Sequence, residues 1–262
     1  MEHDIFFEKL WSELKQILKL MVLTAPTQLF ITLPSVVCYM LAGHVSNDDF
    51  DAVGLGQSFL NVAFSASNGM AMACEIFLSQ ANGSSKRSAL GLVVQRCLVI
   101  SLLLFLLVAS MVIHFPAALV LLGKSEQFVD NVRNFIYACL PGLLGYAVMI
   151  IEMKYLQCQK IVKPCVIVGI IVNVLHIVYA LPLTVWSGLG ATGSGISLSI
   201  TYWLWSLILF VYIRQSDMYQ ETWRPWSMEA LQHWKSILKT AVPSIVLIML
   251  ELICVEIFTV LS

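Results

Sequence analysis

Seven long and mostly apolar stretches constrain the fold more than any other feature of this sequence. They run approximately over residues 20–42, 53–79, 90–113, 132–151, 162–185, 191–213 and 240–262. A helix of about 20 mostly apolar residues is long enough to cross a hydrocarbon core roughly 30 Å thick. The stretches are continuous, whereas the strands of a membrane barrel would show as short alternating segments. We therefore predict an all-α integral membrane protein with seven transmembrane helices.

The composition agrees with this assignment. Apolar residues make up 59% and charged residues only 12% of the 262 positions, against about 45–50% and about 25% in an average soluble domain. A soluble globule of this length could not bury so much apolar surface, so the surplus must face lipid. The formal charge of −1 gives no reason to expect nucleic acid as a partner. The first 19 residues carry many charges and no cleavable signal, so the first apolar helix should itself insert the chain.

No pattern of residues points to an enzyme, a metal site or an organic cofactor. The seven cysteines form no C-x-x-C pair, and most lie inside apolar stretches, where they pack as small apolar residues. We find no phosphate-binding glycine loop and no nucleophile elbow. The glycine-rich run at 188–195 joins two predicted membrane helices, so close helix packing explains it better than nucleotide binding.

The distribution of Lys and Arg predicts the orientation. With the N-terminus in the cytoplasm, thirteen of the fifteen basic residues fall on the cytoplasmic side, and only Lys124 and Arg133 fall on the other. Cytoplasmic loops of membrane proteins carry such an excess of Lys and Arg. We expect a multi-pass protein of the plasma membrane with a cytoplasmic N-terminus.

A short repeat suggests how the chain is organised. The segment 11–19 has the sequence WSELKQILK and precedes Pro26, while 234–239 has the sequence WKSILK and precedes Pro243. Six predicted spans separate the two copies, so the first and seventh spans share one orientation, as in transporters built from two parallel six-helix halves. A match this short can also arise by chance.

The repeat divides the chain into four predicted parts. These are a cytoplasmic amphipathic segment (1–19), a six-helix N-terminal lobe (20–213), a cytoplasmic inter-lobe linker with an amphipathic helix that Ser227 could cap (214–239), and the seventh transmembrane helix (240–262). On this interpretation the seventh helix begins a second lobe that lies beyond the chain.

Two carboxyl groups in the seventh span are the leading functional candidates. Glu251 and Glu256 have no basic residue nearby in sequence, and five residues turn a helix by about 140°. One carboxyl can therefore face a central cavity while the other faces a neighbouring helix. A hydrocarbon environment disfavours the charged form, so such a group can hold a proton and release it when a cation arrives. The alternative is that one of them, Glu256 above all, reaches water at the membrane surface.

The remaining polar residues of the spans have plainer interpretations. Gln28 lies between Pro26 and Pro34, which free backbone carbonyls and bend a helix, as happens where helices line a cavity. Asn61, Asn68 and Asn173 could be hydrogen-bonding glue between helices. For the ionisable residues we expect a structural role for Glu75, a solvated interfacial cluster of Glu152 with Lys154, and simple packing for His176.

Several short motifs, in this order and spacing, resemble one family over nearly the whole chain. They are Ala42-Gly43-His44 with Phe50-Asp51-Ala52-Val53, Ala73-Cys74-Glu75 through Ser79-Gln80-Ala81-Asn82-Gly83, Val94-Gln95-Arg96, Pro141 with Lys154-Tyr155-Leu156 and Gln159, Trp223-x-x-Trp226-Ser227, and Pro243-Ser244 with Leu250-Glu251. The chain is similar in these motifs to the multidrug and toxic compound extrusion (MATE) transporters, specifically their animal branch.

The resemblance implies a fold and a set of roles. Family members have twelve helices in two six-helix lobes and export organic cations against proton or sodium entry, with protons as the coupling ion in the animal branch. By position, Glu251 and Glu256 fall on the paired acids of the seventh helix, and Gln28 and Asn61 fall on polar positions that face the cavity. Pro26, Pro34, Glu75 and Gln80 are candidates for structural or gating positions. The chain departs from the family where aromatic residues between the two acids are replaced by residues 252–255, and it lacks the second lobe.

Two functions follow as expectations. The first is a proton-coupled antiporter that exports organic cations and drugs, with this chain as part of a longer protein. The alternative is a truncated, non-transporting membrane fragment that binds or regulates full-length copies. The expected partners are organic cations, the lipid bilayer and the missing C-terminal lobe or full-length copies, with no nucleic acid, no metal and no cofactor other than the proton.

Overall fold

A computed structural model describes residues 2–84, 87–223 and 225–261, and every regular element within these ranges is a helix. The side chains of residues 2–7, 16–17, 19–20, 23 and 256–261 lie outside the description. The elements are α1 (Glu2–Val45), α2 (Asn47–Gly83), α3 (Ala89–Leu121), α4 (Glu126–Cys158), α5 (Lys163–Leu181), the π-helix η1 (Pro182–Trp186), α6 (Gly190–Gln215), α7 (Asp217–Thr222), the 3₁₀ turn η2 (Met228–Leu231) and α8 (Trp234–Leu261).

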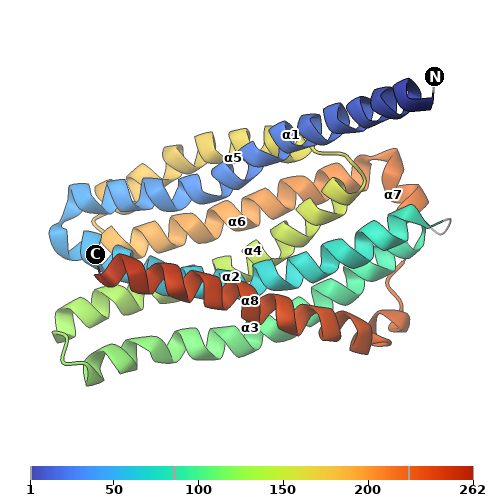
Figure 1. Ribbon diagram of the computed structural model, residues 1–262. Coiled ribbons are helices and arrows are strands. Elements are labelled where there is room, and N and C mark those ends of the chain that lie inside the picture. The colour runs from blue at the N-terminus through green and yellow to red at the C-terminus, as the bar shows by residue number, and fades with distance from the viewer. Residues whose placement is uncertain (1, 85–86, 224, 262) are drawn as a thin grey trace.

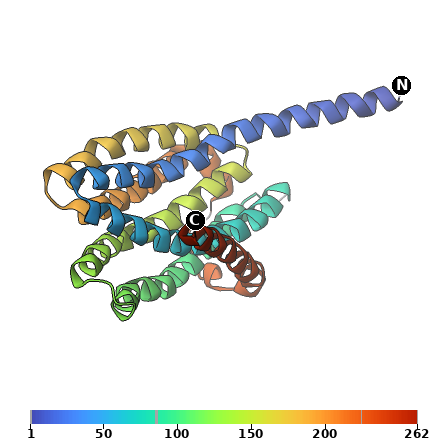
Figure 2. The same ribbon diagram turned by 60° about the vertical axis from the view of Figure 1, so that its left-hand side comes forward.

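The seven predicted spans are confirmed. Within the described residues, seven helical segments are long and apolar enough to cross a membrane, and each contains most of one predicted stretch. Most of the helices extend beyond the predicted boundaries. The longest is α1, whose 44 residues span about 66 Å. Its first half projects beyond the rest of the molecule (Figure 2).

The long helices form an antiparallel bundle with loops at two ends (Figure 1). At one end, here called the inner end, α3, α5 and α8 begin and α2, α4 and α6 finish; this is the end that the basic residues predict to be cytoplasmic. Helix α2 lies near the middle and packs against α1, α3, α4 and α8, while α1 packs mainly against α5. Helix α8 crosses the face of α2 (Figure 1).

The most extensive contact joins α4 and α6, and small residues make it possible. A Cβ atom on Gly142 would lie 2.7 Å from the backbone of Ser199, and one on Gly145 would lie 3.1 Å from the Trp203 ring. Gly195 likewise leaves room for the carbonyl of Phe135. Such small residues let helix backbones approach closely in a membrane. The glycine-rich run at 188–195 therefore serves close helix packing, as predicted.

At the other end of the bundle, here called the outer end, one carboxylate contacts two loops. The Asp49 side chain accepts a 2.7 Å hydrogen bond from the Ser46 hydroxyl, and it also accepts the backbone N–H of Ala191 at 2.8 Å. The Ser46 hydroxyl in turn accepts the backbone N–H of Asp49 and caps α2. Asp49 thus fixes the first turn of α6, where the positive end of the helix dipole favours an anion.

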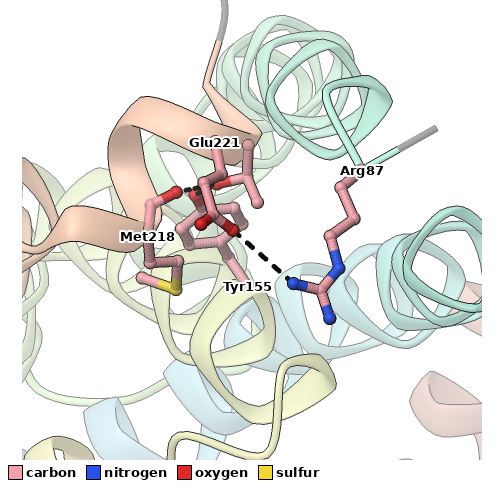
Figure 3. A network of polar contacts seen from close by, with 5 residues as sticks. Arg87, Tyr155, Met218 and Glu221 are labelled. Carbon is pink, nitrogen blue, oxygen red and sulfur yellow. Dashed lines mark hydrogen bonds and ion pairs between the residues drawn. The ribbon is translucent and has the colours of Figure 1, made fainter. Parts of the chain in front are cut away.

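The segment between α6 and α8 is bound to the first six helices rather than loose. The Tyr155 hydroxyl of α4 forms a short hydrogen bond with buried Thr222 of α7, and Arg87 pairs with Glu221 at 3.5 Å (Figure 3). Further along, the Arg96 guanidinium of α3 donates to the backbone carbonyl of Glu229 at 3.2 Å. Side chains from three parts of the bundle therefore hold both short helices of this segment.

The predicted cap at Ser227 does not form, because the residues that follow make only a 3₁₀ turn and the hydroxyl makes no capping bond. A two-residue joint, Gln232 and His233, then leads into α8. His233 has a positive φ of 61°, and the indole of Trp234 donates back to the carbonyl of Ala230 at 2.7 Å. The segment 234–239 is the first part of α8 itself, continuous with the seventh span.

Candidate functional site

Glu251 lies well inside the membrane-spanning part of α8. It is twelve residues beyond Lys239, the last basic residue of the chain, which is about 18 Å along the helix axis. Helices α8 and α2 touch at Gly69, where a Cβ atom would overlap the backbone of Ile245. Since the two helices are antiparallel, Glu251 sits at about the depth of residues 61–63 of α2. Its side chain is exposed on the described chain.

The other three predicted site residues have different surroundings. Gln28 is exposed on α1, and Asn61 is half-buried on α2, where it accepts a 3.0 Å hydrogen bond from the Gln57 amide. The side chain of Glu256 lies outside the described residues. Gln57 was not singled out from the sequence, although its position one turn before Asn61 was a usable signal. Its side chain is only 3% exposed, and its carbonyl oxygen has no partner among the described residues.

The pockets formed by described residues lie away from these candidate residues. Three pockets of about 230 to 510 Å³ are formed by described residues, and none is lined by Glu251, Gln28 or Asn61. The largest of the three lies on the face of α4 and α6 beside Pro141 and Trp203. The roles of Glu251, Glu256, Gln28 and Asn61 therefore stay predictions.

The prolines of α1 do free a carbonyl, and α5 satisfies it. Pro34 has no N–H to donate to the carbonyl of Phe30, four residues earlier. The Asn173 amide of α5 donates to that carbonyl instead, at 3.1 Å. Asn173 is thus the interhelical glue predicted from the sequence, and Asn68 is another example because it accepts the Tyr146 hydroxyl at 2.8 Å. Pro34 is buried and Pro26 is half-buried.

An ion pair joins α2 to α4 near the inner end. The Lys154 ammonium lies 2.6 Å from the Glu75 carboxylate, with the two side chains 19% and 43% exposed. On the next turns of α2 the Asn82 amide donates to the carbonyl of Cys158 at 2.9 Å, while Gln80 is exposed. The Glu75 carboxylate thus contacts α4 from α2, and its structural or gating role stays a prediction.

The predicted solvated cluster of Glu152 with Lys154 is wrong. Glu152 is buried, and its carboxylate accepts a 2.9 Å hydrogen bond from the Ser206 hydroxyl of α6. Two residues turn a helix by about 200°, so Glu152 and Lys154 point to opposite sides of α4. The first faces α6 and the second faces α2.

His176 is a packed polar residue, as expected. It is fully buried between α1, α5 and α6, and its Nδ1 lies 2.7 Å from the Thr201 hydroxyl. Its Nε2 lies 3.7 Å from the Cys38 sulfur. Within the described residues, no group of three or more His, Cys, Asp or Glu side chains could hold a metal ion.

Comparison with known families and sequences gives a consistent result. The family model MatE matches residues 24–181. The sequence is 28% identical over 244 residues to multidrug and toxin extrusion protein 1 of Xenopus tropicalis, covering 93% of this chain and 42% of that protein. It is 30% identical over 236 residues to multidrug and toxin extrusion protein 2 of Mus musculus, covering 90% and 41%. The chain spans less than half the length of these curated relatives.

Solved structures show the same fold. The crystal structure of the eukaryotic MATE transporter AtDTX14 superposes with a TM-score of 0.85 at 25% identity, over 91% of this chain and 54% of that one. The inward-facing conformation of a multidrug resistance MATE family transporter of the MOP superfamily superposes with a TM-score of 0.72 at 16% identity, over 85% and 51%. The helical arrangement described above therefore matches about half of such a structure.

Proposed function

The chain belongs to the MatE family, and we propose that it is the first part of a proton-coupled antiporter that exports organic cations and drugs. One observation carries the choice of mechanism. Glu251 is an acidic residue about 18 Å along α8 from Lys239, on an exposed face of the helix. A carboxyl group at such depth is costly to keep charged, and such groups in membranes serve ion pathways and proton relays.

In this mechanism a proton and the substrate cation compete for the Glu251 carboxyl. The protonated form is neutral and suits the hydrocarbon depth. A bound cation stabilises the deprotonated form instead, because opposite charges attract strongly where water is scarce. Glu256 assists from the next turn, while Gln28 and Asn61 orient the cation with amide groups.

The coupling has a defined thermodynamic limit. One unit of pH difference across the membrane supplies about 1.4 kcal/mol, which is a tenfold ratio of cation concentrations for one-for-one exchange. Alternating access would come from rocking of the six-helix lobe (20–213) against a second lobe that begins with the seventh helix (240–262). The linker (214–239) would join the two on the cytoplasmic side, and the plasma membrane is the proposed location.

The test measures uptake of a fluorescent organic cation into vesicles as a function of external pH. The protein is this chain continued by the second half of one of its relatives. We expect an outward proton gradient to drive uptake and the variant Glu251→Gln to abolish the gradient-driven part. Glu126→Gln is the control, because Glu126 is an exposed carboxylate in the first turn of α4. Uptake by Glu251→Gln that still follows the proton gradient would reject the mechanism.

A further inference from the structure

The interface of α4 and α6 contains one ionisable side chain that the transport mechanism above does not use. The residues of α6 that contact α4 lie along one face, at Ser199, Trp203 and Ser206. The first two contact the backbone of α4 around Pro141 and Gly142. The third meets Glu152, whose side chain is 7% exposed, and Ser206 itself is 4% exposed. Glu152 is therefore a carboxyl group buried in a closely packed helix contact.

No cation among the described residues pairs with this carboxyl group. Ser206 is the one side chain that hydrogen-bonds to Glu152 among the described residues. Four charged groups on elements that contact α4 have other partners. Glu75 of α2 pairs with Lys154, and Arg96 of α3 donates to the carbonyl of Glu229. Arg214 of α6 donates to the Tyr219 hydroxyl, and Glu221 of α7 pairs with Arg87.

A single hydroxyl cannot replace the hydration of a carboxylate. Burial of an unpaired charge costs far more than one hydrogen bond returns, and a buried carboxyl in this situation keeps its proton instead. The Ser206 hydroxyl can donate to Oε2 in either protonation state. The neutral acid is therefore the form that fits the packed interface.

We propose that Glu152 is a proton-binding site within the first six helices, distinct from the acid on α8, with the proton as its ligand. This goes beyond the proposed antiport function and does not depend on it. Glu152 lies six residues before the end of α4 at Cys158, about 9 Å along the helix axis. Release of its proton requires water to reach the α4–α6 contact from the inner end, so binding of the proton and closure of that contact are linked.

The proposal can be tested by infrared spectroscopy of this chain in lipid nanodiscs. A protonated carboxyl group has its own C=O stretching band, which ionised carboxylates at the surface do not contribute at neutral pH. We expect the wild-type chain to show this band at neutral pH and Glu152→Gln to lose its Glu152 component. We expect Ser206→Ala to shift the band to higher frequency, because the acid loses a hydrogen-bond donor.

Two further variants separate this site from others. Glu126→Gln should leave the band unchanged, since Glu126 is exposed. Glu251→Gln removes any contribution of the α8 acid and should leave the Glu152 component of the band in place. The proton-binding role of Glu152 and the antiport role of Glu251 are therefore tested by different variants. A Glu152→Gln spectrum that superimposes on the wild type would overturn the proposal. If that variant does not fold, an unshifted band in Ser206→Ala would overturn it equally.

Discussion

Gly142 of α4 donates its backbone N–H to the hydroxyl of Ser199 of α6, at 3.0 Å. The same hydroxyl donates to the carbonyl of Ala138 at 2.6 Å, which is the carbonyl that Gly142 would bond in a regular helix. A side chain of one helix is thus inserted into the hydrogen-bond ladder of another, next to Pro141. Insertions of this kind and prolines are the usual causes of bends in helices.

We expect Gly142→Ala to destabilise the protein by about 1–3 kcal/mol, the usual cost of overpacking. The added methyl group would lie 2.7 Å from Ser199 and would separate α4 from α6. The measurement is thermal unfolding in detergent. Gly83→Ala is the matched control, since a Cβ at Gly83 meets nothing within 4 Å. Equal stability of the two variants would contradict the close contact.

Replacement of Asn173 should cost about 1 kcal/mol, because the carbonyl of Phe30 loses its donor. The structure predicts that this cost depends on Pro34. In Pro34→Ala, residue 34 regains an N–H that can bond the Phe30 carbonyl within α1. The loss caused by Asn173→Ala should therefore be smaller in the Pro34→Ala background, and unfolding in a double-mutant cycle measures the difference. Additive effects would show that the two residues do not share this carbonyl.

The ion pair of Glu75 and Lys154 should respond to exchange of its charges. We expect Glu75→Lys to destabilise the protein, because two ammonium groups would then face each other between α2 and α4. The double variant Glu75→Lys with Lys154→Glu should recover most of the loss. Because the pair is partly exposed, it should contribute about 1 kcal/mol or less to the free energy of unfolding. A double variant no more stable than Glu75→Lys alone would show that the pair does not hold the helices together.

The contact between Tyr155 and Thr222 should control the motion of α7. In Tyr155→Phe the Thr222 hydroxyl loses its partner on α4, while the ring and its packing remain. We expect faster hydrogen exchange of the backbone amides over residues 217–223, with unchanged exchange in the middle of α4. Tyr137→Phe is a suitable control, because Tyr137 is an exposed tyrosine of the same helix that bonds a carbonyl of α3. Unaltered exchange of α7 in Tyr155→Phe would show that other contacts hold it.

Features that depend on one segment at a time could be predicted from the sequence. Apolar length gave the seven spans, because a bilayer imposes that length on each helix separately. The glycine-rich run, Asn68 and Asn173 were also assigned correctly, since small and amide residues in a span have few alternatives to helix–helix contact.

Features that depend on which helix lies opposite could not be predicted. Glu152 and Lys154 are close in sequence, and only the positions of α2 and α6 reveal that they face different neighbours. The insertion of Ser199 into α4 joins residues 57 apart in the chain, with no local signal at either. For the candidate site, the sequence singled out Glu251 as a candidate from its residue type and its depth in the span. The contact of Gln57 with Asn61 is an i, i+4 pair whose spacing was visible in the sequence, but its burial was not.

The hydrogen bond from Arg96 of α3 to the carbonyl of Glu229 in η2 limits how far the N-terminus of α8 can be displaced. From Leu231, the last residue of η2, to Trp234 there are three residue steps, which reach roughly 10 Å even when fully stretched. The hydrogen bond from the indole of Trp234 to the carbonyl of Ala230 restricts this connection further. A change in the tilt of α8 would therefore pivot at its N-terminus, because Trp234 has to stay close to the contact between Arg96 and the carbonyl of Glu229.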